Sequence, residues 1–206
     1  MNKSLILDTE TTGLPDCRGL RFSEYPEYTD LEKYDSSRVI QISYITTDKQ
    51  YNYISDSDII IKSEVSIDNH EFHGITNEIS ELKGIPFLEF AKKFMEVLKE
   101  CDTIIAHNIR FDINVLKSEF YRYSCFNILA LLDKKKYVCT MNYTKRLVGI
   151  PARNGFGFKN PSLKELYYFA TGEVMQNHHT CSYDTSNLLC SIQRLYKKGK
   201  WRRAMC

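Results

Sequence analysis

The hydrophobic pattern of the chain changes near residue 85 of its 206 residues. Before that point, short apolar runs typical of β-strands cover residues 5–7, 38–45 and 52–62, and none of them has a helical period. After it, segments with a 3.6-residue apolar period alternate with short apolar runs. The first three strands are expected to form an antiparallel meander. Strands first and strand-helix alternation afterwards predict an α/β fold, a mixed sheet with helices on its faces.

The second part of the chain predicts four helices and two short strands. Pro86 opens the first helix and Pro161 the third, because proline is favoured in the first helical turn. Gly172 closes the third helix, since glycine is the common residue after a helix end. The expected helices are 86–101, 111–123, 161–172 and a last one from about Ser182 to Leu195, with strands at 103–107 and 134–140.

Length and composition favour one globular domain over residues 1–206, because 43% of the residues are hydrophobic. The seven cysteines are odd in number and lack a CxxC pair, which suits reduced thiols. No apolar run approaches the roughly 18 residues of a membrane span, and no signal-peptide pattern opens the chain. We therefore expect an intracellular, cytoplasmic protein with no membrane partner. The net charge of +2 is small, so any phosphate-binding surface must be local.

Two segments interrupt the regular pattern. Residues 16–37 are polar, rich in tyrosine and without a period, and so long a connection is usually a functional loop. Residues 149–160 form a second loop that is dense in glycine and aromatic side chains.

Acidic side chains stand where the expected elements begin or end. Asp8 and Glu10 follow an apolar strand and point to the same face, whereas Thr9 points away. Asp112 follows the strand 103–107, and Asp184 lies near the start of the last helix. If the fold gathers these acids, each pair about 4 Å apart repels by about 4 kcal/mol at an effective dielectric near 20. Two divalent cations would relieve this repulsion, and oxygen ligands suit Mg²⁺ or Mn²⁺.

Each of these residues also has an ordinary structural explanation. A lone acid pair on a strand is often a solvated edge, Asp112 can cap the helix after it, and Asp184 can favour a helix N-terminus. His178 and His179 with Cys181 suggest zinc, but a fourth ligand at suitable spacing is missing. The conjunction of four acids and a histidine, each at an expected element end, favours the metal site.

The same residues carry a family resemblance. "LILDTETTGLP" (5–15), "TIIAHNIRFDINVL" (103–116) and "HTCSYDTSNLL" (179–189) resemble the three motifs of the DEDDh 3′-to-5′ exonucleases. That group includes the DNA polymerase III epsilon subunit, ribonuclease T and the Trex enzymes. "HGIT" (73–76) and "PSLKEL" (161–166) resemble its secondary landmarks. The resemblance spans nearly the whole chain in order and implies a ribonuclease H-like fold with a central five-stranded mixed sheet.

The resemblance also implies the role of each site residue. Asp8, Glu10, Asp112 and Asp184 correspond to the ligands of two divalent cations, Mg²⁺ or Mn²⁺. His179, in an H-x4-D spacing with Asp184, corresponds to the general base, and His179 and Glu10 are the expected catalytic residues. The product would be a nucleoside 5′-monophosphate. The expected substrate contacts are Thr11, Thr12, Gly13, Leu14, His107, Asn108 and Phe111, with the aromatic residues of the two loops stacking on further bases.

Some features depart from the pattern of the group. His178 precedes His179, and only His179 stands in the H-x4-D register. The stretch "YVCTM" (137–141) lacks the aspartate that many relatives have before this threonine, and it resembles phage, large-virus or bacterial versions, as does the long loop at 16–37. For a viral version the location would be the cytoplasm or nucleus of the host cell.

Three functions stay open at this point. The first is trimming of DNA from single-stranded or frayed 3′ ends, in repair or proofreading. The second is trimming of RNA or short oligoribonucleotides. It stays open because the sequence has no feature that reads the 2′-hydroxyl and so distinguishes RNA from DNA. The third is a non-catalytic nucleic-acid binding module. A homodimer or a polymerase partner is compatible with each of them.

Overall fold

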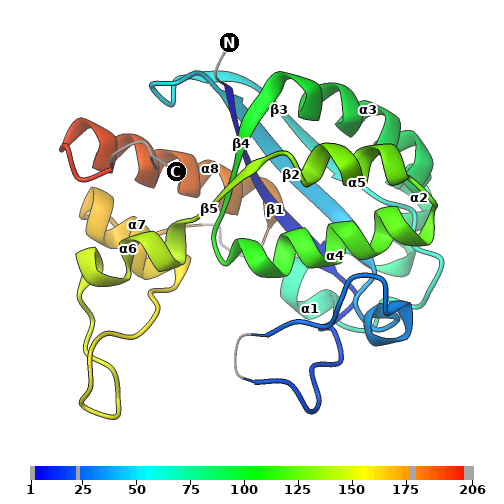
Figure 1. Ribbon diagram of the computed structural model, residues 1–206, viewed down its shortest axis with the longest axis horizontal. Helices are drawn as coiled ribbons and strands as arrows, with labels where there is room; N and C mark the ends of the chain where they lie inside the picture. The colour runs from blue at the N-terminus through cyan, green and yellow to red at the C-terminus, as the bar shows by residue number, and fades with distance from the viewer. Residues whose placement is uncertain (1–2, 22–23, 177–179, 202–206) are drawn as a thin grey trace.

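The computed structural model describes residues 3–21, 24–176 and 180–201, and a five-stranded sheet forms its centre (Figure 1). The strands are β1 (Lys3–Thr11), β2 (Val39–Thr47), β3 (Tyr53–Ile60), β4 (Cys101–Ala106) and β5 (Lys136–Cys139). Their order across the sheet is β3-β2-β1-β4-β5. The β1, β2 and β3 strands pair antiparallel, whereas β4 and β5 continue parallel to β1. The predicted meander and mixed sheet are confirmed.

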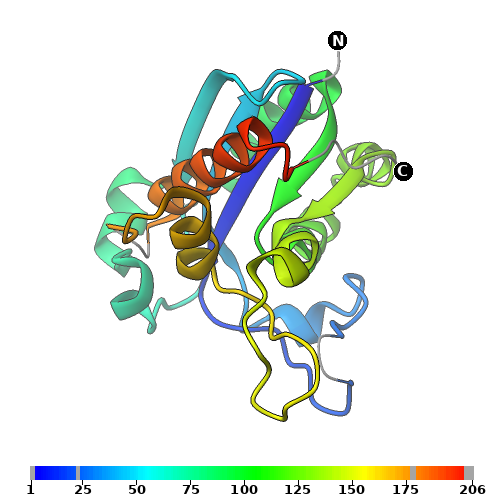
Figure 2. The same cartoon turned by 90° about the vertical axis from the view of Figure 1, so that its left-hand side faces the viewer.

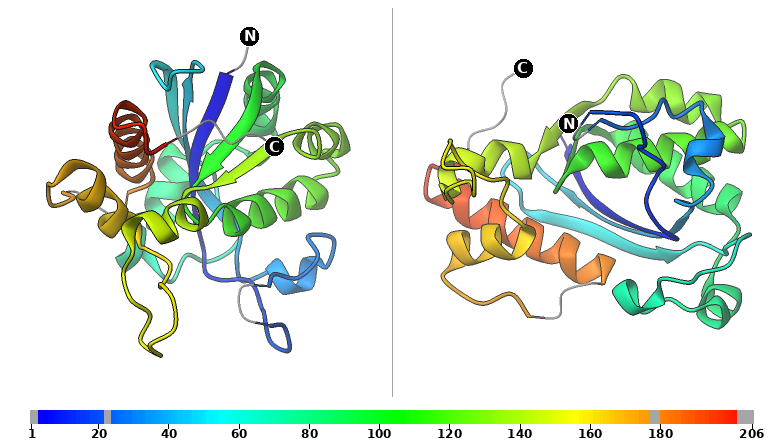
Figure 3. Two further views of the ribbon diagram at one scale, coloured as in Figure 1. Left: turned by 60° about the vertical axis from the view of Figure 1, so that its left-hand side comes forward. Right: turned by 90° about the horizontal axis from the view of Figure 1, so that it is seen from below.

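Helices cover both faces of the sheet (Figure 3). The helices are α1 (His70–His73), α2 (Asn77–Lys83), α3 (Phe87–Glu100), α4 (Ile109–Arg122), α5 (Phe126–Leu132), α6 (Thr140–Val148), α7 (Leu163–Thr171) and α8 (Cys181–Lys197). One core joins the sheet to α3, α4 and α5, and a second joins it to α7 and α8. The central strand β1 therefore lies between two hydrophobic layers.

Alternation along β1 builds both layers. Leu5 and Leu7 belong to the core under α3 and α4, while Ile6 belongs to the core under α7 and α8. All three side chains are fully buried. Because successive strand residues point to opposite faces, Asp8 and Glu10 continue the row of Ile6, and Thr9 continues the row of the leucines. The two acids therefore point toward the face of the sheet that packs against α8. Figure 2 shows α8, in orange and red, lying across this face.

The structure contains short elements that the hydrophobic pattern does not predict. Helices α1, α2, α5 and α6 have between four and nine residues, too few turns for a clear period. The segment 16–37 includes a 3₁₀ helix, Leu31–Tyr34. Tyr34 is fully buried there, and its hydroxyl donates to the carbonyl of Pro26 at 2.7 Å. This part of the predicted loop is therefore anchored to the core.

Two further expectations concern the whole chain. The six cysteines that the structure describes are all free, as predicted for reduced thiols. None of the described helices is long and apolar enough to cross a bilayer.

Candidate active site

The second half of β1 contributes two of the predicted acids. Asp8 and Glu10 are half-buried and share one face of the strand, as the alternation predicts. Thr9 points the other way, and its hydroxyl donates a 2.9 Å hydrogen bond to Oδ1 of Asp112. One strand therefore supplies two carboxylates directly and holds a third through a buried hydroxyl.

The first turn of α4 contributes Asp112. The chain turns from β4 into this helix at Asn108, which has a left-handed backbone with φ of 68°, a conformation that asparagine tolerates better than most residues. Asp112 is only 3% exposed, so its carboxylate is turned inward against Thr9. The predicted position of Asp112 at an element boundary is confirmed.

The first turn of α8 contributes Asp184, and Cys181 fixes this turn to the sheet. The amide of Ser43 on β2 donates to Sγ of Cys181 at 3.1 Å, and this thiol donates to the carbonyl of Asp8 at 2.9 Å. Asp184 follows Cys181 by three residues, which is about one helical turn. A buried thiol thus sets the distance between the start of α8 and the acidic strand.

The four acids lie close enough for their charges to act on Asp8 and Glu10. Burial and the charges of the other three acids raise the pKa of Asp8 well above its usual value. Burial and the charges of Asp184 and Asp112 raise the pKa of Glu10 to about 7. Burial raises the pKa of Asp112 to about 7, although the Thr9 hydroxyl opposes the shift. The structure therefore brings together all four predicted acids, at an electrostatic cost.

No described lysine or arginine forms an ion pair with Asp8, Glu10 or Asp112. The missing positive charge and the all-oxygen donor set fit hard divalent cations such as Mg²⁺ or Mn²⁺. Within the described ranges, no three acidic, histidine or cysteine side chains are already arranged to hold a metal ion. The acids are thus near neighbours without a finished coordination shell. His179, the predicted general base, and its neighbour His178 lie outside the described residues.

The segment after β1 is locked against residues 36–38. The hydroxyl of Thr11 donates to the Gly13 carbonyl at 2.6 Å, and the hydroxyl of Thr12 donates to the Ser36 carbonyl at 3.1 Å. A Cβ atom on Gly13 would lie 2.6 Å from the same Ser36 carbonyl oxygen, so only glycine fits. The amide of Thr12 donates to the carbonyl of Arg38. Thr12 is a predicted substrate contact, and its amide is thus already bonded within the protein.

The remaining predicted contacts lie around the turn from β4 to α4. One ring nitrogen of His107 is 2.9 Å from the Thr140 hydroxyl, and the other is 3.0 Å from the Pro161 carbonyl oxygen. His107 therefore joins β4 to α6 and α7, and burial lowers its pKa. Its contact with a nucleotide stays a prediction, and both of its nitrogens already have partners.

Leu14 and Asn108 line a groove of about 490 Å³, and each is four residues from an acid of the site in the chain, Glu10 and Asp112. Tyr25, from the 16–37 segment, also lines it and packs on Phe111 with ring centroids 6.3 Å apart. Leu14 is 74% exposed, so its side chain is available at the mouth of the groove. The groove has room for the end of a nucleic-acid strand, and the contacts of Thr11, Thr12, Gly13, Leu14, Asn108 and Phe111 with substrate stay predictions.

Sequence reasoning misses the residues that position the site. Cys181 carries no signal in a single sequence, because its partners lie 138 and 173 residues away. His73, in the "HGIT" landmark, contacts Asn69 at 3.1 Å, and the Asn69 side chain donates to the Thr11 carbonyl. This landmark therefore supports the end of β1.

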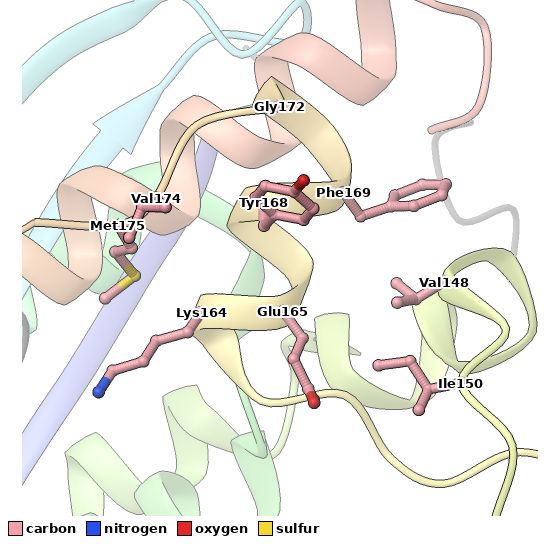
Figure 4. A pocket seen from close by; sticks show the side chains of 9 residues that line it. All are labelled: Val148, Ile150, Lys164, Glu165, Tyr168, Phe169, Gly172, Val174 and Met175. Atoms are coloured by element: carbon pink, nitrogen blue, oxygen red, sulfur yellow. The ribbon is translucent and has the colours of Figure 1, made fainter.

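A larger hollow of about 690 Å³ lies elsewhere, between α6 and α7 (Figure 4). Its walls are mostly apolar, with Val148, Ile150 and Phe169 among them. None of the predicted site residues lines it. The groove beside Leu14, unlike this hollow, is lined by two of the predicted substrate contacts, Leu14 and Asn108.

Known proteins share both the sequence pattern and the fold. The family model RNase_T, described as an exonuclease, matches residues 5–190. The chain belongs to this exonuclease family. Its predicted membership of the DEDDh exonucleases is confirmed, and the exonuclease is a hydrolase that acts on nucleic acid. The family typically uses divalent metal ions.

One curated relative of the exonuclease is the DNA polymerase III subunit epsilon of Rickettsia prowazekii. The two are 27% identical over 117 residues, which cover 57% of this chain and 44% of the relative. The exonuclease also resembles solved structures of exonuclease I from Escherichia coli. The zinc-bound complex with single-stranded DNA has a TM-score of 0.67 at 20% identity and covers 96% of this chain and 41% of that one.

A second exonuclease I complex, with a dT13 oligonucleotide, has a TM-score of 0.68 at 18% identity. It covers 95% of this chain and 41% of the other. These matches confirm the predicted ribonuclease H-like fold. The exonuclease spans about two fifths of the length of these proteins.

Proposed function

We propose that the exonuclease removes nucleotides one at a time from the 3′ end of DNA and releases nucleoside 5′-monophosphates. The observation that carries this proposal is the gathering of Asp8, Glu10, Asp112 and Asp184 near the end of β1. Burial and neighbouring acids raise the pKa values of Asp8 and Glu10, and burial raises that of Asp112. Such a set is unfavourable for stability and suited to two divalent cations, Mg²⁺ or Mn²⁺.

The chain's own residues divide the work. When bound, the two cations activate a water molecule and stabilise the departing 3′ oxygen. Asp8 and Glu10 from β1, Asp112 from α4 and Asp184 from α8 would hold them. Thr9 keeps the Asp112 carboxylate oriented through its 2.9 Å hydrogen bond. Leu14, exposed at the groove, packs against the terminal base.

The proton of the attacking water needs an acceptor. His179 is the candidate, because a histidine with a reference pKa of about 6.5 titrates near neutral pH. A positioned base of this kind contributes on the order of 10² to 10⁴ in rate. Glu10 shares the catalytic role because it would be one of the ligands of the cations that activate the water.

The names of the similar proteins support the substrate and partner. One is an exonuclease I bound to single-stranded DNA, and another is a subunit of a DNA polymerase. We infer that single-stranded or frayed DNA ends are the substrate and that a polymerase is a candidate partner, with proofreading or repair as the process. A homodimer and a cytoplasmic location stay predictions.

The test uses 5′-labelled single-stranded DNA and the matching RNA, each with Mg²⁺, Mn²⁺ or EDTA. A metal-dependent ladder that shortens from the 3′ end is the expected result, with DNA cut faster than RNA. Asp184→Ala should abolish the ladder, whereas Glu96→Ala, on the exposed face of α3, should not change it. Faster cutting of RNA would replace DNA as the substrate, and intact oligomers under every condition would contradict the proposal.

A further inference from the structure

The loop at 149–160 is an ordered hairpin that projects beside the site. Pro151 and Phe158 pair across it as an isolated antiparallel bridge, and the Lys159 amide donates to the Ile150 carbonyl at 2.9 Å. At the tip, Gly155 and Gly157 have φ of 77° and 68°, values that favour glycine. Figures 1 and 2 show this hairpin, in yellow, projecting from the same end of the molecule as the blue segment that follows β1.

The hairpin holds aromatic rings in water. Phe156 is 83% exposed and Phe158 is 40% exposed. Two phenylalanines on a glycine-rich tip add nothing to a core that lies elsewhere, and they cost solubility. Exposed rings of this kind are the platforms on which proteins stack the bases of single strands.

Positive charges face these rings from the last turn of α6. Lys145 and Arg146 line a hollow of about 650 Å³ together with Phe156, Gly157 and Phe158, and we call this hollow the α6–hairpin notch. No acidic residue lines it. In the described part of the chain, no ion pair reaches Lys145 or Arg146. Both charges thus remain available to an anion, besides stabilising the end of the helix.

The notch and the groove beside Leu14 lie along the same helix, α6. Met141, in the first turn of α6, and Asn160, at the base of the hairpin, both line the groove that contains Leu14. Lys145 follows Met141 by about one helical turn, or roughly 6 Å along the axis. The same helix and the same hairpin therefore form walls of both hollows.

We propose that the α6–hairpin notch binds the nucleic-acid strand upstream of its 3′ end. A base stacks on Phe156 and Phe158, and Lys145 and Arg146 contact the adjoining phosphates. The notch then holds the strand after each nucleotide leaves, so it sets the preference for long over short substrates. The proposal rests on the proposed function only in taking nucleic acid as the ligand.

Binding in EDTA tests the notch separately from hydrolysis. The probes are a fluorescein-labelled dT20 and a labelled dT3, and the readout is anisotropy. Phe156→Ala and Arg146→Ala should each raise the Kd for dT20 at least about fivefold, the effect of losing one stacking or charge contact. Phe156→Trp should restore binding because it keeps an aromatic face. Phe126→Ala and Lys92→Ala, exposed on α5 and α3, are the matched controls.

Two further readouts separate stacking from general damage. Arg146→Ala should lower the slope of log K against log salt by about 0.7, the value for one phosphate contact on a single strand, and Phe156→Ala should leave it unchanged. With Mg²⁺, both substitutions should lower kcat/KM relative to the wild type, and the decrease should be larger for dT20 than for dT3. A Kd for dT20 within twofold of wild type in both variants would overturn the proposal. If the wild type cleaves neither oligomer, the proposed function fails while the EDTA measurement still decides the notch.

Discussion

The two halves of β1 lie in the same sheet but have opposite effects on the stability of the fold. Leu5, Ile6 and Leu7 are fully buried between two hydrophobic layers, which stabilises the fold. Asp8 and Glu10, directly after them, have pKa values raised by burial and by neighbouring acids. The first half is an ordinary core strand. The second half is unfavourable for stability unless a cation binds its carboxylates.

The difference shows how the fold supports an unfavourable site. The acids come from three elements, and neutral groups rather than cations hold the elements together. The Thr9 hydroxyl holds Asp112, and the Cys181 thiol holds α8 against Asp8 and Ser43. The core supplies the stability, so the end of the strand can keep its charges.

The largest expected effect comes from removing a central carboxylate. Asp8→Ala should lower kcat by about 10³-fold or more, because the cations lose a ligand and the reacting groups lose their electrostatic support. In EDTA the same variant should unfold at an equal or higher urea concentration, since a destabilised buried acid is gone. Rates like those of the wild type would remove Asp8 from the site.

The adjacent residue should behave in the opposite way. Leu7→Ala should lower the free energy of unfolding by about 2 to 5 kcal/mol, the cost of a large cavity in a core. The kcat per folded molecule should stay close to wild type, because Leu7 points to the opposite face of β1 from Asp8 and Glu10. Urea denaturation followed by tryptophan fluorescence measures the first, and active-site-normalised rates measure the second. A Leu7→Ala protein with the free energy of unfolding of the wild type would contradict the role of Leu7 in the core.

The pH dependence of stability should change with metal. The pKa values of Glu10 and Asp112 are raised to about 7, so their protonated forms are favoured in the folded state. The stability that protonation contributes is complete below about pH 4 and is lost as the pH rises through about 7. Mg²⁺ binds the ionised acids, so it should raise Tm by at least about 5 °C at pH 8 and little at pH 5.

The matched variant for this measurement is Glu10→Gln with Asp112→Asn. It should show a smaller gain in Tm from Mg²⁺ at pH 8 than the wild type, because two of the four ligands are lost, and a flatter pH dependence in EDTA. Equal stabilisation of the wild type by Mg²⁺ at pH 5 and pH 8 would argue against raised pKa values in the cluster.

A smaller effect is expected from the hydroxyl that holds Asp112. Thr9→Val keeps the shape of the side chain and removes the 2.9 Å hydrogen bond. The pKa of Asp112 should rise further, because the Thr9 hydroxyl lowers it in the wild type. We expect kcat to fall about tenfold or less, the size of one hydrogen bond of about 1 kcal/mol. Thr9→Ser, which keeps the donor, is the control.

The sequence predicts the sheet, the long helices and the four acids well. Periodicity marks α3 and α8 because each buries one face, and the acids stand at element ends where alternation places them. The short helices α1, α2, α5 and α6 are not predicted, because a helix of so few turns shows too few apolar positions to reveal its period. The 3₁₀ helix at Leu31–Tyr34 escapes because its polar neighbours hide one fully buried tyrosine.

Long-range contacts are beyond a single sequence. Arg38 and Glu119, 81 residues apart in the chain, form an ion pair at 2.5 Å. Both side chains are largely buried, and no local sequence pattern predicts the pair. Burial and the Glu119 carboxylate act in opposite directions on Arg38, and its pKa is raised on balance. Cys181 is a further case, since a lone cysteine does not announce the two bonds of its thiol. Such contacts require the fold to be known first.

The most direct test of the cation site is anomalous diffraction from crystals soaked in Mn²⁺. We expect anomalous peaks among Asp8, Glu10, Asp112 and Asp184, two in the presence of a 3′-terminal nucleotide, and none there in Asp8→Ala. Ordered Mn²⁺ at other positions only, with the four carboxylates free of metal, would contradict the claim that this end of β1 is built for divalent cations.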